Sequence, residues 1–188
     1  TSYLFNQLLA KLFSVPANVE SVWITGLILF LILVPATTGY EVFGVVMITL
    51  IAMASKYVLA IEKKHIFNPA AIALVVMGLA GSDLAIWWIG NDIMWPIVAI
   101  VGLLIVRKIR RMQMFFVFLL SSLLMIALVS FRTGVPITES LVQGLVSWPL
   151  LFFGTVMLTE PLTTPTTHAH QLLYGAIVGI ITGSQVHI

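Results

Sequence analysis

Long apolar runs, separated by short polar stretches, make up most of this chain of 188 residues. A helix that crosses a membrane needs about 20 mostly apolar residues. The runs predict six such helices, at about residues 22–36, 42–61, 67–89, 93–106, 114–131 and 139–158. A last apolar run, at 172–183, predicts a partial or seventh helix. The pattern therefore predicts an all-α integral membrane protein in which residues 1–188 form a single transmembrane domain.

The stretch before the first run is different, because polar residues and Lys11 interrupt its apolar positions between Tyr3 and Phe13. Amphipathic helices of this kind lie in the plane of the membrane interface. We expect residues 1–14 to form an amphipathic segment at the membrane surface.

Composition agrees with the membrane assignment. Hydrophobic residues make up 60% of the chain and charged residues only 9%, whereas a soluble domain carries about 25% charged residues. So few charges cannot cover a soluble surface. The chain contains no cysteine, which excludes disulfides and cysteine-ligated iron–sulfur clusters or zinc from it.

The distribution of lysine and arginine predicts an orientation. Basic residues gather in the loops at 62–65 and 107–111, whereas the loops after the first and third runs contain none. Loops rich in lysine and arginine stay on the cytoplasmic side. We therefore expect a multi-pass protein of a bacterial-type inner membrane with its N-terminus in the cytoplasm, and Arg132 is the one exception to the charge pattern.

Two polar segments with proline interrupt the apolar runs on that same side. They are "HIFNPAAIAL" at 65–74 and "LTEPLTTPTTHAH" at 158–170. Irregular backbone at membrane depth is tolerated only where protein surrounds it or a cavity lies beside it. Interrupted helices at matching places in two halves of a chain are typical of a ligand site. The pattern predicts that the two segments meet and form one.

Asn68 and Pro69 suit the start of a helix, since asparagine caps helices and proline is well tolerated as the first helical residue. The capping role alone is one interpretation. The other is that the N–H groups of this helix start face an electron-rich ligand.

Glu160 stands among threonines and prolines that could offer hydroxyls to a ligand with several polar edges; the candidates are Thr159, Glu160, Pro161, Thr163 and Thr164. A solvated acid in an ordinary loop is the alternative. Lys56 lies inside the second apolar run. It either extends its ammonium group to the interface or contacts a ligand or Glu160.

Small residues at Gly175, Gly179 and Gly183 share one helix face. Such a face favours close packing of two helices. None of the six predicted spans contains a histidine, which argues against a membrane haem.

The segments "KHIFNPAAIAL" (64–74) and "FFGTVMLTEPLTTPTTHAHQLLYGAIVGIITG" (152–183) resemble a family of membrane flavin proteins. This family comprises the flavin-binding membrane subunits of the sodium-pumping NADH:quinone reductase and of the Rnf electron-transport complex, which transfer electrons. The two segments together cover about a quarter of the chain. The matched positions are Asn68, Pro69, Thr159, Glu160, Pro161, Thr163 and Pro165.

The chain departs from the family in two ways. Typical members are longer, and those that attach FMN covalently carry a Ser/Thr-Gly-Ala-Thr type motif, which is absent here. The resemblance therefore implies a non-covalent flavin, riboflavin or FMN, in an electron-transfer component of an oxidoreductase.

The chain has no glycine-rich nicotinamide-binding fingerprint. The expected electron donor is therefore a cytoplasmic NAD(P)H- or ferredoxin-linked reductase domain or subunit. Membrane lipid is the other expected partner, a homodimer is left open, and no nucleic acid is expected. A non-redox carrier or channel, and a structural anchor for a soluble reductase, are the alternatives.

Overall fold

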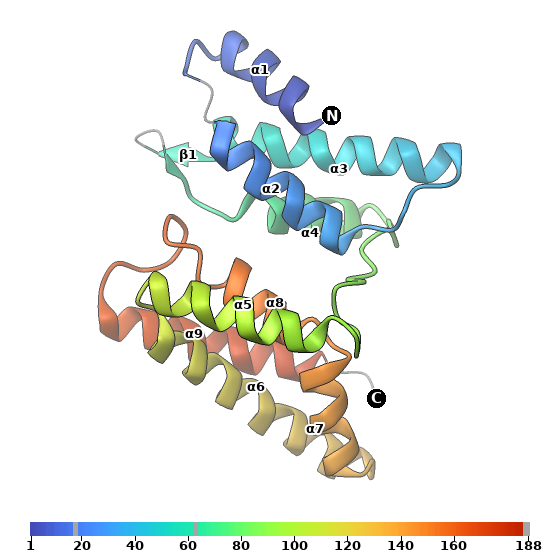
Figure 1. Cartoon of the computed structure of the whole chain (residues 1–188), viewed down its shortest axis with the longest axis vertical. Coiled ribbons are helices and arrows are strands. Elements are labelled where there is room, and N and C mark those ends of the chain that lie inside the picture. The colour runs from blue at the N-terminus through green and yellow to red at the C-terminus, as the bar shows by residue number, and fades with distance from the viewer. Residues whose placement is uncertain (17–18, 62–63, 186–188) are drawn as a thin grey trace. The chain divides into compact units, whose positions relative to one another are not determined.

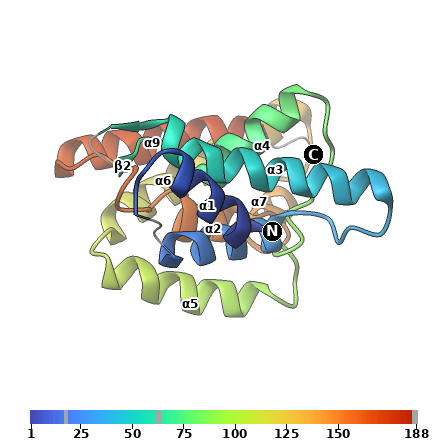
Figure 2. The ribbon, with the colours of Figure 1, turned by 90° about the horizontal axis from the view of Figure 1, so that it is seen from above.

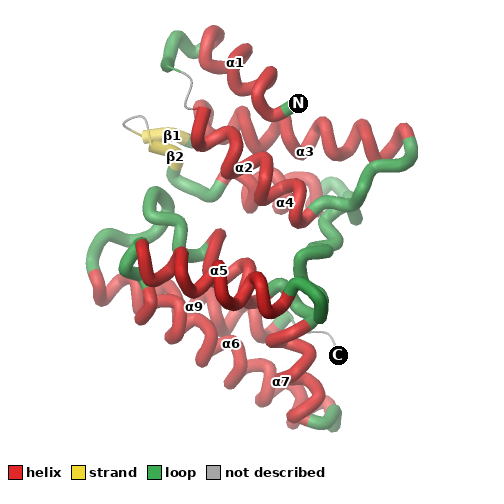
Figure 3. The backbone as a smooth tube through the Cα atoms, viewed as in Figure 1, coloured by secondary structure: helices red, strands yellow, loops and turns green. Residues whose placement is uncertain are grey.

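The computed structural model describes residues 1–16, 19–61 and 64–185, and this part of the chain is helical apart from loops and one short β-hairpin (Figure 3). The predicted all-α class is therefore confirmed. The chain divides into two compact units, Thr1–Trp88 and Ile89–Ile188, and each is described by itself. The expectation of a single domain stays a prediction.

Unit 1, which is Thr1–Trp88, contains four helices and the hairpin within its described residues (Figure 1). The elements are α1 (Ser2–Leu12), α2 (Val19–Ile32), α3 (Gly39–Val58), β1 (Ala60–Ile61), β2 (Lys64–His65) and α4 (Pro69–Leu79). The antiparallel strands pair Ala60 with His65 and Ile61 with Lys64. This hairpin lies where the sequence predicts a basic loop, of which Glu62 and Lys63 are outside the described residues.

Unit 2, which is Ile89–Ile188, is built on the packing of two helices, α6 and α9. Its elements are α5 (Trp95–Lys108), α6 (Met112–Thr133), α7 (Ile137–Val146), α8 (Leu150–Phe152), the π-helix η1 (Phe153–Met157) and α9 (His168–Ser184). Met114, Phe118, Leu150 and Leu158 form a fully buried apolar cluster in this unit. The core therefore lies where α6 meets α8 and the end of η1.

Two helices of the described chain, α3 and α6, are long and apolar enough to cross a membrane. A third candidate combines α7 with the stretch Leu150–Met157, which α8 and η1 form. The two parts are bent by 55° relative to each other. The helices α2 and α4 are apolar but shorter. The structure thus has two or three candidate spans by length and composition, and the six-helix bundle stays a prediction.

The helix predicted over 67–89 is wrong in its extent, since α4 ends at Leu79. Gly81 has the left-handed φ of +84°. The Ser82 N–H donates to the Met77 carbonyl and the Gly81 N–H to the Gly78 carbonyl, both at 2.9 Å. This is the Schellman arrangement, which ends a helix at a glycine.

The segment after α4 pairs with the end of α2. The Val34 N–H donates to the Leu84 carbonyl at 2.9 Å, and the Trp87 N–H to the Ile32 carbonyl at 2.8 Å. The Trp88 indole Nε1–H donates to the Phe30 carbonyl at 2.7 Å. The last two bonds satisfy carbonyls in the last turn of α2, where a helix leaves its carbonyls without an internal partner.

The helix predicted over 139–158 is also interrupted, between Val146 and Leu150. Pro149 lies at the break and has no N–H with which to continue an α-helical ladder. The chain bends by 55° there, and the helix that resumes changes to π geometry at Phe153.

The predicted close packing at the three glycines is confirmed. A Cβ placed on Gly175, Gly179 or Gly183 would lie 2.7, 2.5 or 2.6 Å from a backbone carbonyl oxygen of α6. The carbonyls belong, in order, to Met114, Phe118 and Ser122. Both series rise by four residues, so α9 and α6 run parallel and start at the same end of unit 2 (Figure 1). Figure 2 shows α9 from above.

Candidate functional site

The predicted site segment of unit 2 is the loop between η1 and α9, residues 158–167, called the polar loop below. His168, directly after it, is hydrogen-bonded through Nε2 to the side chain of Gln113 in the first turn of α6. The basic turn at 107–111 comes just before that helix. The polar loop and the basic turn therefore lie at the same end of unit 2.

Thr159 is completely buried. Its hydroxyl donates to the Thr155 carbonyl at 2.7 Å. The proton of this hydroxyl is therefore already used within the chain, and only its lone pairs are left for a ligand.

Thr163 is hydrogen-bonded to the neighbouring acid, Glu160. Its hydroxyl lies 3.3 Å from Glu160 Oε2 and 3.4 Å from the Glu160 carbonyl oxygen. Glu160 is half-buried, and the next residue, Pro161, is exposed. The structure thus gives this acid a threonine partner within the polar loop.

Thr164 has a buried hydroxyl that is not satisfied. The residue is only 7% exposed, and its Oγ1 has no hydrogen-bond partner among the described residues. A buried hydroxyl without a partner costs free energy. Of the predicted site residues in the polar loop, this one is therefore the best suited to bind a polar atom supplied from outside the chain.

Gln171 is a residue that the sequence analysis did not single out. It is buried in the first turns of α9, and its Nε2 donates to the carbonyls of Pro165 and Thr166 at 3.0 and 3.2 Å. It thereby attaches the polar loop to the helix. Its signal in the sequence is a lone amide side chain at the start of an apolar helix.

In unit 1, Asn68 caps α4 and Pro69 is the first helical residue, as predicted. Asn68 Oδ1 accepts a hydrogen bond from the Ala71 N–H at 3.0 Å. Pro69, the first helical residue, has no N–H that would need a partner. The cap is therefore confirmed, and the ligand role of this helix start stays a prediction.

Lys56 connects two helices of unit 1. Its Nζ donates to the Ser21 carbonyl at 2.7 Å and to Ser21 Oγ at 2.9 Å. The end of α3 is thus joined to the start of α2. Contact of Lys56 with a ligand or with Glu160 stays a prediction, as does the meeting of Asn68 with the polar loop, since these residues belong to different units.

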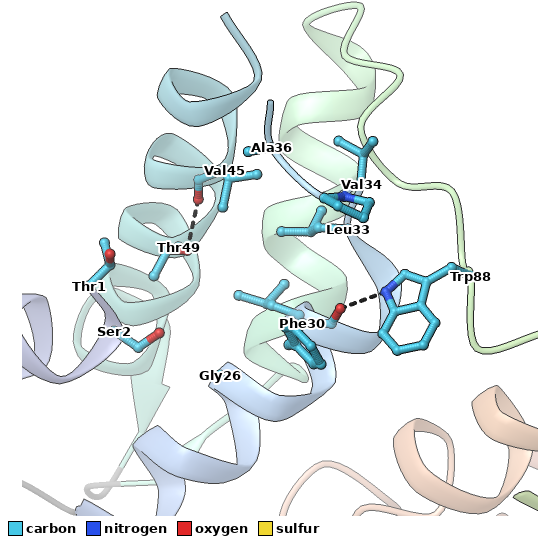
Figure 4. A pocket seen from close by; sticks show the side chains of 12 residues that line it. Thr1, Ser2, Gly26, Phe30, Leu33, Val34, Ala36, Val45, Thr49 and Trp88 are labelled. Atoms are coloured by element: carbon cyan, nitrogen blue, oxygen red, sulfur yellow. Dashed lines mark hydrogen bonds between the residues drawn. The ribbon is translucent and has the colours of Figure 1, made fainter. Parts of the chain in front are cut away.

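Unit 1 also contains a pocket of about 630 Å³ between the start of α1, α2 and α3 (Figure 4). Apolar side chains, aliphatic and aromatic, form most of its wall. The Thr49 hydroxyl donates to the Val45 carbonyl at 2.7 Å, and the Trp88 indole to the Phe30 carbonyl. These two polar groups are satisfied within the protein, and the hydroxyls of Thr1 and Ser2 also border the pocket.

Comparison of the chain with models of protein families, with curated proteins and with solved structures finds no match. The resemblance in the two polar segments therefore stands on those residues alone.

Proposed function

We propose that the chain is a membrane electron-transfer domain that binds a flavin, riboflavin or FMN, without a covalent bond. It accepts electrons from a cytoplasmic reductase domain or subunit and passes them across or within the membrane. In this proposal the chain forms a six-helix bundle with a further C-terminal helix, and its loops rich in lysine and arginine are cytoplasmic.

The observation that carries the proposal is the unpartnered hydroxyl of Thr164 in the polar loop, as judged from the described residues. A flavin ring presents carbonyl oxygens and ring nitrogens along one edge, and the protein tunes its chemistry through hydrogen bonds and nearby charge. Thr164 can supply such a hydrogen bond. Glu160, held by Thr163, supplies the charge.

The position of the basic turn supports the side on which electrons arrive. The turn at 107–111 and the polar loop share one end of unit 2, since α6 and α9 start together. If the turn is cytoplasmic, the polar loop faces the compartment of a soluble reductase.

The first test is the purified full chain. We expect a yellow protein that releases a flavin on treatment with acid, identified by absorption and mass analysis. A colourless protein with no flavin by mass would overturn the proposal and favour a carrier or channel. Flavin that stays with the polypeptide in a denaturing gel would overturn only the non-covalent attachment.

The second test locates the site. Thr164→Val keeps the size of the side chain and removes one hydrogen-bonding group. Loss of such a buried bond costs about 1–3 kcal/mol, so flavin should dissociate roughly tenfold or more readily. The matched control is Thr133→Val, an exposed threonine at the far end of α6. Equal flavin-to-protein ratios after identical purification would place the flavin away from the polar loop.

A further inference from the structure

The helix α1 buries an amide side chain and exposes a stripe of leucines. Asn6 and Ala10 are buried, at 2% and 5% exposed, whereas Leu4, Leu8 and Leu12 are 66%, 65% and 76% exposed. The three leucines are spaced by four residues and so lie on one side of the helix. An amide inside and a leucine stripe outside indicate an apolar medium around the helix.

The buried amide holds α1 against the end of α3. The Tyr57 hydroxyl donates to Asn6 Oδ1 at 2.7 Å and lies 3.2 Å from the Asn6 carbonyl oxygen. Phe13 stacks on the Tyr57 ring at 5.5 Å between ring centres. The stretch of α1 from Asn6 onward therefore lies beside the last turn of α3.

The first turn of α1 lies much further along α3. A Cβ placed on Gly26 of α2 would be 3.3 Å from Ser2 Oγ. Thr1 and Ser2 border the same pocket as Gly26 and Thr49 (Figure 4). Thr49 precedes the end of α3 by nine residues, which is about 14 Å of helix, or about half of a hydrocarbon core that is ~30 Å thick.

We propose that α1 is inserted into the hydrocarbon beside α3, with Leu4, Leu8 and Leu12 in contact with lipid acyl chains. It runs from the level of the middle of the membrane at Ser2 to the headgroup level at Lys11, where the exposed ammonium group meets the lipid headgroups. This replaces the surface helix that the sequence predicts. The proposal rests on α3 as a membrane span and is independent of the flavin.

The two arrangements differ in the depth of the leucines. In an inserted helix the depth falls steadily from Leu4 to Leu12, by up to about 12 Å for eight residues at 1.5 Å each. In a helix that lies in the interface plane, the three positions have equal depth. The depths of Leu4, Leu8 and Leu12 therefore distinguish an inserted helix from a helix at the membrane surface.

The test uses single cysteines with nitroxide labels in the full chain in lipid bilayers, which is clean because the chain contains no cysteine. Labels replace Leu4, Leu8 and Leu12 in three variants, and collision rates with oxygen and with a water-soluble nickel chelate give the depth. Leu124→Cys, on the exposed side of α6 near its middle, is the deep control. Thr138→Cys, exposed at the start of α7, is the aqueous control.

We expect oxygen to dominate at position 4 as it does at position 124, with the ratio shifting toward the nickel chelate through 8 to 12. Equal ratios at the three positions would overturn the proposal in favour of a surface helix. Nickel-dominated collisions like those at position 138 would show that the stripe faces water. Low rates with both reagents would show that protein, such as a second copy of the chain, covers it.

Discussion

Arg110 ends α5 in a backbone conformation that normally belongs to glycine. Its φ is +60°. The Arg111 N–H donates to the Val106 carbonyl at 3.0 Å and the Arg110 N–H to the Arg107 carbonyl at 3.2 Å, which is the arrangement found at Gly81. A side chain in the left-handed region costs roughly 1–2 kcal/mol. The basic turn therefore keeps an arginine at a position where glycine would be more stable.

We expect Arg110→Gly to raise the free energy of unfolding by about 1 kcal/mol, because glycine adopts this conformation without the steric penalty. The measurement is thermal or denaturant unfolding in detergent. Arg107→Gly is the matched control in the same turn, and it should lower stability by about 1 kcal/mol because that position is helical. Equal losses in both variants would contradict the strain at Arg110.

At the scale of elements, the contact between α6 and α9 depends on glycines that allow backbone to touch backbone. At Gly179 a Cβ would meet the Phe118 carbonyl oxygen at 2.5 Å and the Ser121 Cβ at 2.8 Å. A backbone atom cannot rotate away as a flexible side chain can. The only relief is a separation of the two helices.

Gly179→Ala should therefore destabilise unit 2 by about 1–3 kcal/mol, the usual cost of overpacking. Gly78→Ala in α4 is the control, since nothing lies within 4 Å of a Cβ there. It should be neutral or stabilise by about 0.5–1 kcal/mol. The measurement is the unfolding midpoint of each variant, and an unchanged midpoint for Gly179→Ala would mean that the helices are not in this close contact.

The apolar runs predict where most helices lie, because a helix that is buried in protein or surrounded by lipid needs a long apolar stretch in either case. The helices α3, α6 and α9 all begin a few residues before the predicted runs. The runs do not reveal where a helix stops inside apolar sequence. Gly81 and Pro149 are the signals at two such stops, and the apolar run that resumes a few residues later concealed each break. The strands of the hairpin at 60–65 are only two residues long, so they leave no alternating apolar pattern in the sequence that would predict them.

The same limit applies to the candidate site. The polar loop was predictable because threonine, proline and glutamate stand out in an apolar chain. Which hydroxyl is free was not predictable, since Thr159 and Thr164 look alike in the sequence. Their difference comes from geometry, as one bonds to a carbonyl in the preceding turn and the other meets no partner among the described residues.

At the scale of the whole molecule, the orientation of the chain can be measured directly. We expect the basic turn on the cytoplasmic side and the segment after α4 on the outer side, because lysine and arginine stay in the cytoplasm. The test positions are Lys108→Cys and Asp83→Cys, both exposed. A membrane-impermeant maleimide added to intact cells should label position 83 and spare position 108, which becomes reactive after the cells are opened. The reverse pattern would mean that the basic turn is outside.

The pairing of Trp87 and Trp88 with the end of α2 has a consequence for which helices can lie in a membrane. At 14 residues, α2 is about 21 Å long, shorter than a hydrocarbon core of ~30 Å. A helix normally has to reach water because its last carbonyls need donors, and lipid provides none. Here a neighbouring segment of protein provides donors to two of them, the carbonyls of Phe30 and Ile32. Satisfying these carbonyls lowers the cost of ending such a helix partway through the bilayer, so length alone undercounts the segments that a chain of this kind can hold in lipid.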